Sequence, residues 1–235
     1  MMEQRLPTTA ANPARQHRSE HTRSRKFFLT NHTRLRALLA PVEAPQNPRD
    51  VILESATHAF YTNGVYRTTT EDILVQANVS RRIYSKFFPT KEALILAYLD
   101  TRHERELSLF ATVFRSALTP ELTLNVVLSE VVAELNDPGF RGCAFINAAI
   151  ECRDSPAVLD AVRQHREWYV GAATEVLRRA GHAHPADAAD DLMLARDGAM
   201  TSGYGGDVVS MAAALRRVVD RVLSEIPGPK LASGF

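Results

Sequence analysis

Residues 68–88, TTTEDILVQANVSRRIYSKFF, determine the fold that this sequence predicts. Within Thr68–Asp72 a threonine hydroxyl is followed three positions later by an acidic residue, which is the capping-box pattern that begins a helix. We expect this helix to run to about Ala77. Asn78 then suits a tight turn, because asparagine adopts positive φ more readily than most residues with a side chain. Ser80 caps a second helix, so the stretch predicts two short helices joined by a three-residue turn.

The second helix has two different faces when its residues are placed at about 100° per residue. The polar arc comprises Arg81, Arg82, Ser85 and Lys86, and the opposite arc comprises Ile83, Tyr84, Phe87 and Phe88. Arginine can donate two hydrogen bonds to guanine O6 and N7 in the DNA major groove, while hydroxyls and helix N-terminal amides hold phosphates. A solvated helix face is the alternative. The helix-turn-helix spacing favours DNA binding over that alternative.

The remaining sequence predicts helices almost throughout from Arg49 onward. Helix-start residues, helix-stop glycines and apolar residues three and four positions apart place these helices, and no stretch alternates with the period of two that a strand requires. The chain is therefore expected to be all-α. Beyond the opening stretch the expected helices cover residues 52–63, from 91 onward, 121–136, 143–152, 156–180, 187–202 and 207–226, with a short one over 26–40.

Composition is that of an ordinary globular protein of 235 residues, 45% of them hydrophobic. The apolar runs are far shorter than the roughly 20 residues that cross a bilayer, and the first thirty residues lack the apolar core of a secretory signal, so we expect a cytoplasmic protein. Cys143 and Cys152 are expected to be reduced, packed thiols, with redox sensing as the minor alternative.

Charge is distributed unevenly along a chain whose totals nearly cancel, 28 Lys and Arg against 27 Asp and Glu. Residues 1–48 carry eight basic residues against three acidic ones, and the remainder is mildly acidic. Such an arm could contact the phosphates of nucleic acid. A solvated leader without a function explains the same composition, and the sequence leaves both possibilities open.

Four motifs stand at fixed spacing within residues 49–98: GVYRTTT at 64–70, Ile73, ANVS at 77–80 and FPTKEAL at 88–94. Together they resemble the DNA-binding domain of TetR/AcrR-family transcriptional regulators. The resemblance implies an all-helical homodimer that reads a pseudo-palindromic operator in double-stranded DNA, because two recognition helices related by a two-fold axis read two half-sites. It divides the chain into a basic, flexible N-terminal extension (1–48), a three-helix DNA-binding domain (49–98) and a helical ligand-binding and dimerisation domain (99–235).

The resemblance also implies individual DNA contacts. Thr69 or Thr70 and Lys91 would hold phosphates, and residues of the second helix would lie in or beside the groove. The expected DNA-binding residues are Arg67, Thr69, Thr70, Ser80, Arg81, Arg82, Ile83, Tyr84, Ser85, Lys86 and Lys91. Asn78 stands where the family usually has glycine, Ser85 where a groove-lining tyrosine is usual, and Tyr84 where an aliphatic core residue is usual. Either Tyr84 turns its hydroxyl toward DNA or Lys86 substitutes for the missing contact.

The body of the protein carries two further expected sites. Stripes of small and branched residues on the last two helices suit a four-helix dimer interface, although an intramolecular core has the same pattern; these residues are Leu192, Ala195, Ala199, Met211, Leu215, Val218 and Val222. A bulky apolar set with a few polar side chains suits a pocket for a small-molecule effector, although a plain core has that composition too; the candidates are Phe110, Phe114, Phe145, Asn147 and Trp168.

An enzyme and a protein-binding adaptor are the alternatives to a DNA-binding regulator. Phosphate-binding loops, nucleophile elbows and metal-ligand clusters are absent from the sequence, so we expect no enzyme, no cofactor and no metal; His182 and His184 in an interhelix turn are more often solvated than ligating. An all-helical adaptor that binds only protein is the main alternative, and salt-dependent DNA binding would exclude it. The most probable function is that of a homodimeric repressor released from its operator by a small molecule, which is what the resemblance implies.

Overall fold

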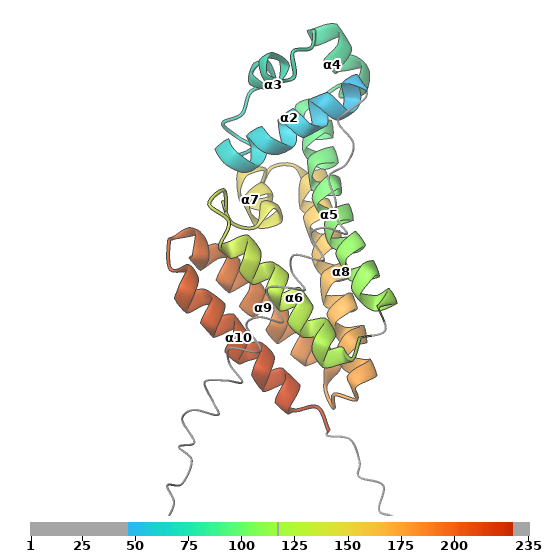
Figure 1. Cartoon of the computed structure of the whole chain (residues 1–235). Helices are drawn as coiled ribbons and strands as arrows, with labels where there is room; N and C mark the ends of the chain where they lie inside the picture. Colours follow the sequence, from blue (N-terminus) through green and yellow to red (C-terminus); the bar gives the residue numbers. More distant parts are fainter. Residues whose placement is uncertain (1–46, 117, 228–235) are drawn as a thin grey trace, which may run out of the picture. The chain divides into compact units, whose positions relative to one another are not determined.

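The computed structural model of the chain describes residues 47–116 and 118–227 (Figure 1). Within these residues it contains nine α-helices and no strand, which confirms the all-α fold class. The helix expected over 26–40 and nearly all of the basic extension lie outside the described residues. The helices are α2 (Pro48–Asn63), α3 (Thr70–Ala77), α4 (Arg81–Phe87), α5 (Lys91–Arg115), α6 (Pro120–Leu135), α7 (Ala144–Glu151), α8 (Pro156–Ala180), α9 (Pro185–Tyr204) and α10 (Val208–Ser224).

Helices α2, α3 and α4 pack around one small core. The side chain of Asn47 caps α2, Pro48 occupies its first turn, and Gly64 ends it with φ 88°, a conformation that favours glycine. Ile52 on α2 and Ile73 on α3 are both fully buried in this core. Truncating either side chain to alanine would cost about 2–5 kcal/mol of stability. This core fixes the orientation of α4, the helix with the basic face.

Helix α5 belongs to both the small N-terminal core and the larger helical body. It packs against α2 near its beginning and against α6, α7 and α8 farther along (Figure 1). Its 25 residues span about 37 Å at 1.5 Å per residue. Leu94 and Tyr98 are buried on its first turns, and Phe110 and Val113 are buried near its end. One continuous rigid element therefore joins the part of the chain that carries α4 to the part that carries the body.

The body consists of α6 to α10, with α9 packed between α8 and α10. Helix α9 begins two residues earlier and ends two residues later than the 187–202 expected from the sequence. Pro185 supplies its first turn, and Gly203, expected in the connecting loop, is helical because it is buried against Leu135, where an added Cβ would lie 2.5 Å from Leu135 Cδ2. No described helix is long and apolar enough to cross a membrane.

Candidate nucleic-acid interface and its link to the body

The turn between α3 and α4 has the geometry that the sequence predicts. Thr69 and Asp72 form a capping box at the start of α3: the amide of Asp72 donates to Thr69 Oγ1 at 3.1 Å, and the amide of Thr69 donates to Asp72 Oδ2 at 2.8 Å. Asn78 adopts the left-handed conformation, with φ 50° and ψ 47°. Ser80 then caps α4 by accepting a hydrogen bond from the amide of Ile83 at 3.3 Å. The local signals alone are thus enough to fix this motif.

Helix α4 presents a polar face to solvent and buries the opposite side. Arg81, Arg82, Ser85 and Lys86 are exposed, as predicted, while Phe88 is buried. Ile83, placed on the apolar arc by the helical wheel, is instead 38% exposed. The polar face therefore also offers one aliphatic side chain, which suits contact with a thymine methyl group.

Tyr84 does not belong to the expected DNA contacts in this conformation. Its side chain is only 4% exposed, its ring packs 6.2 Å from the ring of Phe88, and its hydroxyl is buried. Burial also raises the pKa of this hydroxyl, so it stays neutral. The expectation that Tyr84 turns toward DNA is corrected: it takes the core position that an aliphatic residue would fill, and Lys86 is left as the candidate substitute.

The two arginines at the start of α4 differ in their surroundings. Arg81 forms an exposed ion pair with Glu71 on α3. Arg82 has no ion pair or hydrogen bond through its side chain with any described residue. An exposed ion pair contributes little stability, so Arg81 can exchange Glu71 for another acceptor at small cost. Arg82 needs no such exchange.

The other expected contacts surround the loop between α2 and α3. Arg67 and Thr69 are exposed, whereas Thr70 and Lys91 are half-buried. The ammonium group of Lys91 lies 3.5 Å from the carbonyl oxygen of Tyr66, and burial lowers its pKa. Tyr66 itself is 80% exposed beside Arg67. The sequence analysis did not select Tyr66, although an aromatic residue in a loop that lacks a packing partner marks a candidate surface contact.

Comparison with known proteins agrees with this architecture. Residues 52–98 match the family model of bacterial regulatory proteins of the tetR family, and residues 123–225 match the model of the tetracyclin repressor-like C-terminal domain. The crystal structure of SCO4454, a TetR-family transcriptional regulator from Streptomyces coelicolor, is 32% identical, with a TM-score of 0.72 over 76% of this chain and 95% of that one. This chain belongs to the TetR family of transcriptional regulators.

Two further relatives show how the similarity is distributed within this TetR-family regulator. A putative TetR regulator from Streptomyces avermitilis is 25% identical, with a TM-score of 0.61 over 74% of this chain and 99% of that one. The regulator TtgR of Pseudomonas putida is 44% identical over 62 residues, 26% of this chain. That alignment spans only 30% of the length of TtgR. These relatives identify a DNA-binding transcriptional regulator.

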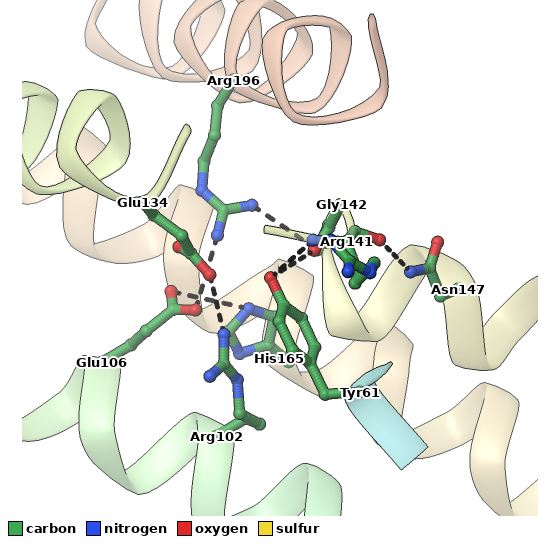
Figure 2. A network of polar contacts seen from close by, with 10 residues as sticks. Tyr61, Arg102, Glu106, Glu134, Arg141, Gly142, Asn147, His165 and Arg196 are labelled. Carbon is green, nitrogen blue, oxygen red and sulfur yellow. Dashed lines mark hydrogen bonds and ion pairs between the residues drawn. The ribbon is translucent and has the colours of Figure 1, made fainter. Parts of the chain in front are cut away.

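A hydrogen-bonded contact joins the DNA-binding helices of this regulator to the loop before α7. Tyr61 on α2 donates its hydroxyl proton to the carbonyl oxygen of Gly142 at 3.3 Å and accepts a hydrogen bond from the amide of Arg141 at 3.1 Å (Figure 2). The guanidinium of Arg102 lies 5.0 Å from the centre of the Tyr61 ring. Asn147 donates to the carbonyl oxygen of Arg141 at 2.8 Å and so holds the loop in place. Tyr61 therefore links α2 to this loop through two hydrogen bonds.

A second contact joins the same two regions. Glu151 at the end of α7 accepts a hydrogen bond from the amide of Tyr66 at 2.6 Å. The space beside Gly64 is filled by this carboxylate, because an added Cβ on Gly64 would lie 3.0 Å from Glu151 Oε2. The loop before α7 thus contacts α2, and the end of α7 contacts the α2–α3 loop, so the two regions are joined by two separate anchors.

A group of buried and half-buried charges lies beside the first anchor (Figure 2). Arg102 on α5 pairs with Glu134 on α6 at 2.7 Å, and Arg196 on α9 faces Glu106 on α5 at 3.4 Å. Burial disfavours the charged form of Arg196, but Glu106 together with the other surrounding groups outweighs it, and the pKa of the guanidinium is raised. Burial raises the pKa of Glu106, and Arg196 opposes that rise. Arg196 was missed by the sequence analysis, although an arginine within the apolar α9 stripe signals it.

His165 adds an uncharged imidazole beside this network. His165 stacks on Phe145 with ring centres 3.5 Å apart, and its Nδ1 lies 3.0 Å from Nδ1 of His103, so one of these two nitrogens donates a hydrogen bond to the other. Burial, with the nearby Arg196 and His103, lowers the pKa of His165 to about 3. Its Nε2 lies 3.8 Å from Glu106 without a hydrogen bond to the described residues. His165 therefore adds no charge at neutral pH.

The expected effector-pocket residues do not come together in either of two cavities that the described residues form. Phe110 lines an apolar cavity of about 40 Å³ among α5, α6, α8, α9 and α10. Phe145 lines a different groove, of about 340 Å³, with His103 and His165. Phe114, Asn147 and Trp168 line neither: Asn147 holds the Arg141 loop, and Trp168 packs its ring 5.2 Å from that of Phe110. The composition of the stretch predicted apolar surroundings but could not say which side chains face an open volume.

The expected dimer stripe is corrected for four of its seven residues. Four of its members, Leu192, Ala199, Leu215 and Val222, are buried inside the described subunit, and Ala195, Met211 and Val218 pack partly against the same core. The exposed rows of α9 and α10 lie elsewhere. They comprise Leu194, Gly198 and Thr201 on α9 and Val209, Ala213 and Arg217 on α10. Leu194 is 69% and Val209 is 82% exposed. The stripe pattern identified the inner face of each helix rather than its outer face.

The remaining candidate residues have structural positions. Cys143 is buried at the start of α7, where its sulfur lies 3.9 Å from Arg196, and Cys152 is half-buried; both are free thiols. His182 is buried and its Nδ1 accepts a hydrogen bond from the amide of His184. The described residues contain no group of three or more side chains suited to a metal ion.

Proposed function

We propose that this TetR-family regulator is a homodimeric repressor that holds a pseudo-palindromic operator and releases it when a small molecule binds the helical body. The observation that carries the proposal is the exposed polar face of α4, oriented by the buried Tyr84 and Phe88 on its other side. A helix anchored in this way after a tight turn can enter the major groove with its N-terminal residues toward the bases.

Arg82 and Lys86 are the first candidates for direct contact, because neither forms an ion pair with the described residues. Arg81 joins them by leaving Glu71. Lys91, Thr69 and Arg67 would hold phosphates from the flanking positions, and Tyr66 would add a hydroxyl beside them. Arginine contacts to base edges carry sequence preference, whereas the phosphate contacts carry mostly salt-dependent affinity.

Dimerisation is proposed along the exposed rows of α9 and α10. Gly198 and Ala213 have small side chains that let two helices approach closely, while Leu194 and Val209 supply apolar surface that is otherwise left in water. Two α4 helices related by a two-fold axis would then read half-sites one helical turn apart, about 34–36 Å. Leu194→Asp should produce a monomer with weak operator affinity, and Leu159→Asp on α8, 39% exposed, is the matched control.

Release is proposed to pass through the loop before α7. A shift of α6 would move Glu134, the partner of Arg102 beneath the Tyr61 ring, and a shift of α9 would move Arg196, which contacts Cys143 in the same loop. Both movements act on the loop that Tyr61 holds through two hydrogen bonds. The ligand must bind more tightly when the DNA-binding helices are in the released position than when they are in the operator-bound position. Only such a difference in affinity shifts the equilibrium between the two conformations.

Selection of bound fragments from genomic DNA tests the proposed function. We expect enrichment of one sequence with two inverted half-sites, and binding that weakens steeply with salt. Arg82→Ala should lose the enrichment while keeping the fold, and Arg163→Ala on the exposed surface of α8 is the matched control. Enrichment of no sequence, or of one without dyad symmetry, would contradict the dimeric reading of the operator.

A further inference from the structure

The cavity of about 40 Å³ in the body is apolar except for three side chains. Leucine, valine, alanine and phenylalanine side chains provide most of its lining, and the polar exceptions are Thr123, Tyr169 and Arg196. Neither a carboxylate nor an amide side chain lines it. The polar character of the site is thus set by two hydroxyls and one guanidinium.

Arg196, one of the residues that line this cavity, has a hydrogen-bond donor without a partner among the described residues. The residue is 5% exposed, its two terminal nitrogens face Glu106, Asp197 and Cys143, and its Nε is buried without a hydrogen-bond partner among the described residues. A buried donor without an acceptor is destabilising, and an acceptor on a bound ligand would remove that cost. The guanidinium of Arg196 lies 4.7 Å from the centre of the Tyr169 ring, and burial raises the pKa of the Tyr169 hydroxyl to about 12, so this hydroxyl keeps its proton.

The charges around the guanidinium are already balanced. Arg196 faces the carboxylates of Glu106 at 3.4 Å and Asp197 at 3.6 Å, and Asp197 is also held by Arg166. An anionic ligand would add an uncompensated negative charge to a buried site, and a cationic ligand would face the guanidinium itself; both carry a large desolvation cost. An uncharged oxygen acceptor satisfies Nε without disturbing this balance.

We propose that the cavity binds a small, uncharged and mostly apolar molecule whose carbonyl-type oxygen accepts a hydrogen bond from Arg196 Nε. This ligand class rests on the proposed function, in which a small molecule acts on the body. The present volume holds only a few atoms, because a single water already occupies about 10–15 Å³ on the same measure. A larger ligand must push the lining residues Leu128 and Val131 of α6 away from Leu215 and Val219 of α10. The same movement displaces Glu134 on α6. Ligand binding therefore shifts Arg102, the ion-pair partner of Glu134, and through it Tyr61.

Four compounds of similar shape separate the possible chemistries: cyclohexyl methyl ketone, ethylcyclohexane, cyclohexanecarboxylate and 1-cyclohexylethylammonium. Their binding to the full chain is followed by calorimetry and by the fluorescence of Trp168, the single tryptophan, whose ring lies 5.2 Å from that of the cavity residue Phe110. We expect the ketone to bind at least about tenfold more tightly than the carboxylate or the ammonium ion. Equal or tighter binding of either ion would overturn the proposal, as would the absence of binding by the ketone up to its solubility.

Two variants test the location and the donor. Ala173→Val places two extra carbon atoms in the cavity and should weaken the ketone at least about tenfold; Ala157→Val, exposed on the same helix, is the control and should leave binding unchanged. Arg196→Lys keeps the positive charge for Glu106 but removes Nε, so it should weaken the ketone about 3- to 10-fold and leave ethylcyclohexane within about twofold. Unchanged ketone affinity in Ala173→Val, or an equal loss for both compounds in Arg196→Lys, would contradict the assignment.

Operator binding by the unliganded protein is measured separately, so the two proposals can fail independently. A protein that binds its operator but none of the compounds would refute the ligand class alone. If the ketone binds as described and operator affinity does not change, the ligand site stands and the proposed release mechanism is refuted.

Discussion

The arginines of α4 and those of the body have the same side chain and opposite surroundings. Arg82 is exposed and lacks a described ion-pair partner, whereas Arg196 is buried and faces two carboxylates. A charge that the protein leaves unpaired in solvent remains available to an outside partner such as DNA. A charge enclosed with its counter-charges is committed to the fold, and only its unused Nε remains for a ligand. The chemistry of each site therefore follows from what the fold has already satisfied.

The largest expected effect comes from breaking the buried pair. Arg196→Met should lower the free energy of unfolding by about 3–5 kcal/mol, because it leaves Glu106 and Asp197 in a buried site without their counter-charge. Urea denaturation measures the change. Arg163→Met removes an exposed arginine from ion pairs on α8 and should change the free energy of unfolding far less, because solvent screens exposed ion pairs. Equal losses of unfolding free energy in the two variants would show that the Arg196 ion pairs contribute no more stability than exposed ion pairs do.

The next effect concerns the exposed arginine. Arg82→Ala should weaken operator binding by about 1–3 kcal/mol and relax the base preference at one position of each half-site, with little change in stability. Fluorescence anisotropy with the selected operator and single-base variants measures both quantities. A uniform loss across all base variants would instead assign Arg82 to a phosphate.

Acid should destabilise the helical body through His165. His165 has a pKa of about 3 in the folded protein and about 6.5 when unfolded, so between these values the unfolded state binds the extra proton. Its contribution to stability is therefore present above pH 6.5 and is lost as the pH falls below it, by at most about 1.4 kcal/mol per pH unit. The groups that face it are Arg196, Arg102, His103 and Glu106. His165→Phe, which can still stack on Phe145, should flatten the unfolding free energy against pH, and an unchanged slope would contradict the buried neutral imidazole.

The contact between Tyr61 on α2 and the loop before α7 should contribute less stability than the buried pair of Arg196 and Glu106. Tyr61→Phe removes one hydroxyl that bonds Arg141 and Gly142 and should lower the free energy of unfolding by about 1 kcal/mol. Tyr66→Phe is the control, because that side chain is 80% exposed. Hydrogen exchange of residues 140–143 should speed up only in Tyr61→Phe. The same exchange rate in both variants would remove Tyr61 from the proposed release route.

The smallest effect distinguishes the two candidates for the missing tyrosine contact. Tyr84→Phe should leave operator affinity within about twofold, because the hydroxyl is buried. Lys86→Ala should reduce both the affinity and the slope of its logarithm against log salt, the slope by about 1. A large loss in Tyr84→Phe would mean that Tyr84 leaves the core when DNA binds.

The sequence predicted the helices of this protein far better than it predicted their faces. Caps such as Thr69, Ser80 and Ser155 act within a few residues, so the helix starts could be read locally. The inner and outer faces of α9 and α10 depend on partners distant in the chain, and both faces carry small or apolar residues. The same limit applies to Arg196, whose pairing with Glu106 spans ninety residues. Tyr84 was ambiguous because its ring fits a core and its hydroxyl fits a phosphate.

The most direct measurement is dimethyl sulfate footprinting of the selected operator, since this reagent methylates guanine N7 in the major groove. The account predicts protection of guanines at symmetric positions in both half-sites by the wild-type protein, and loss of that protection in Arg81→Ala/Arg82→Ala at protein concentrations that still occupy the DNA. Full occupancy with every guanine N7 still reactive, or protection that persists without both arginines, would contradict insertion of the polar face of α4 into the major groove.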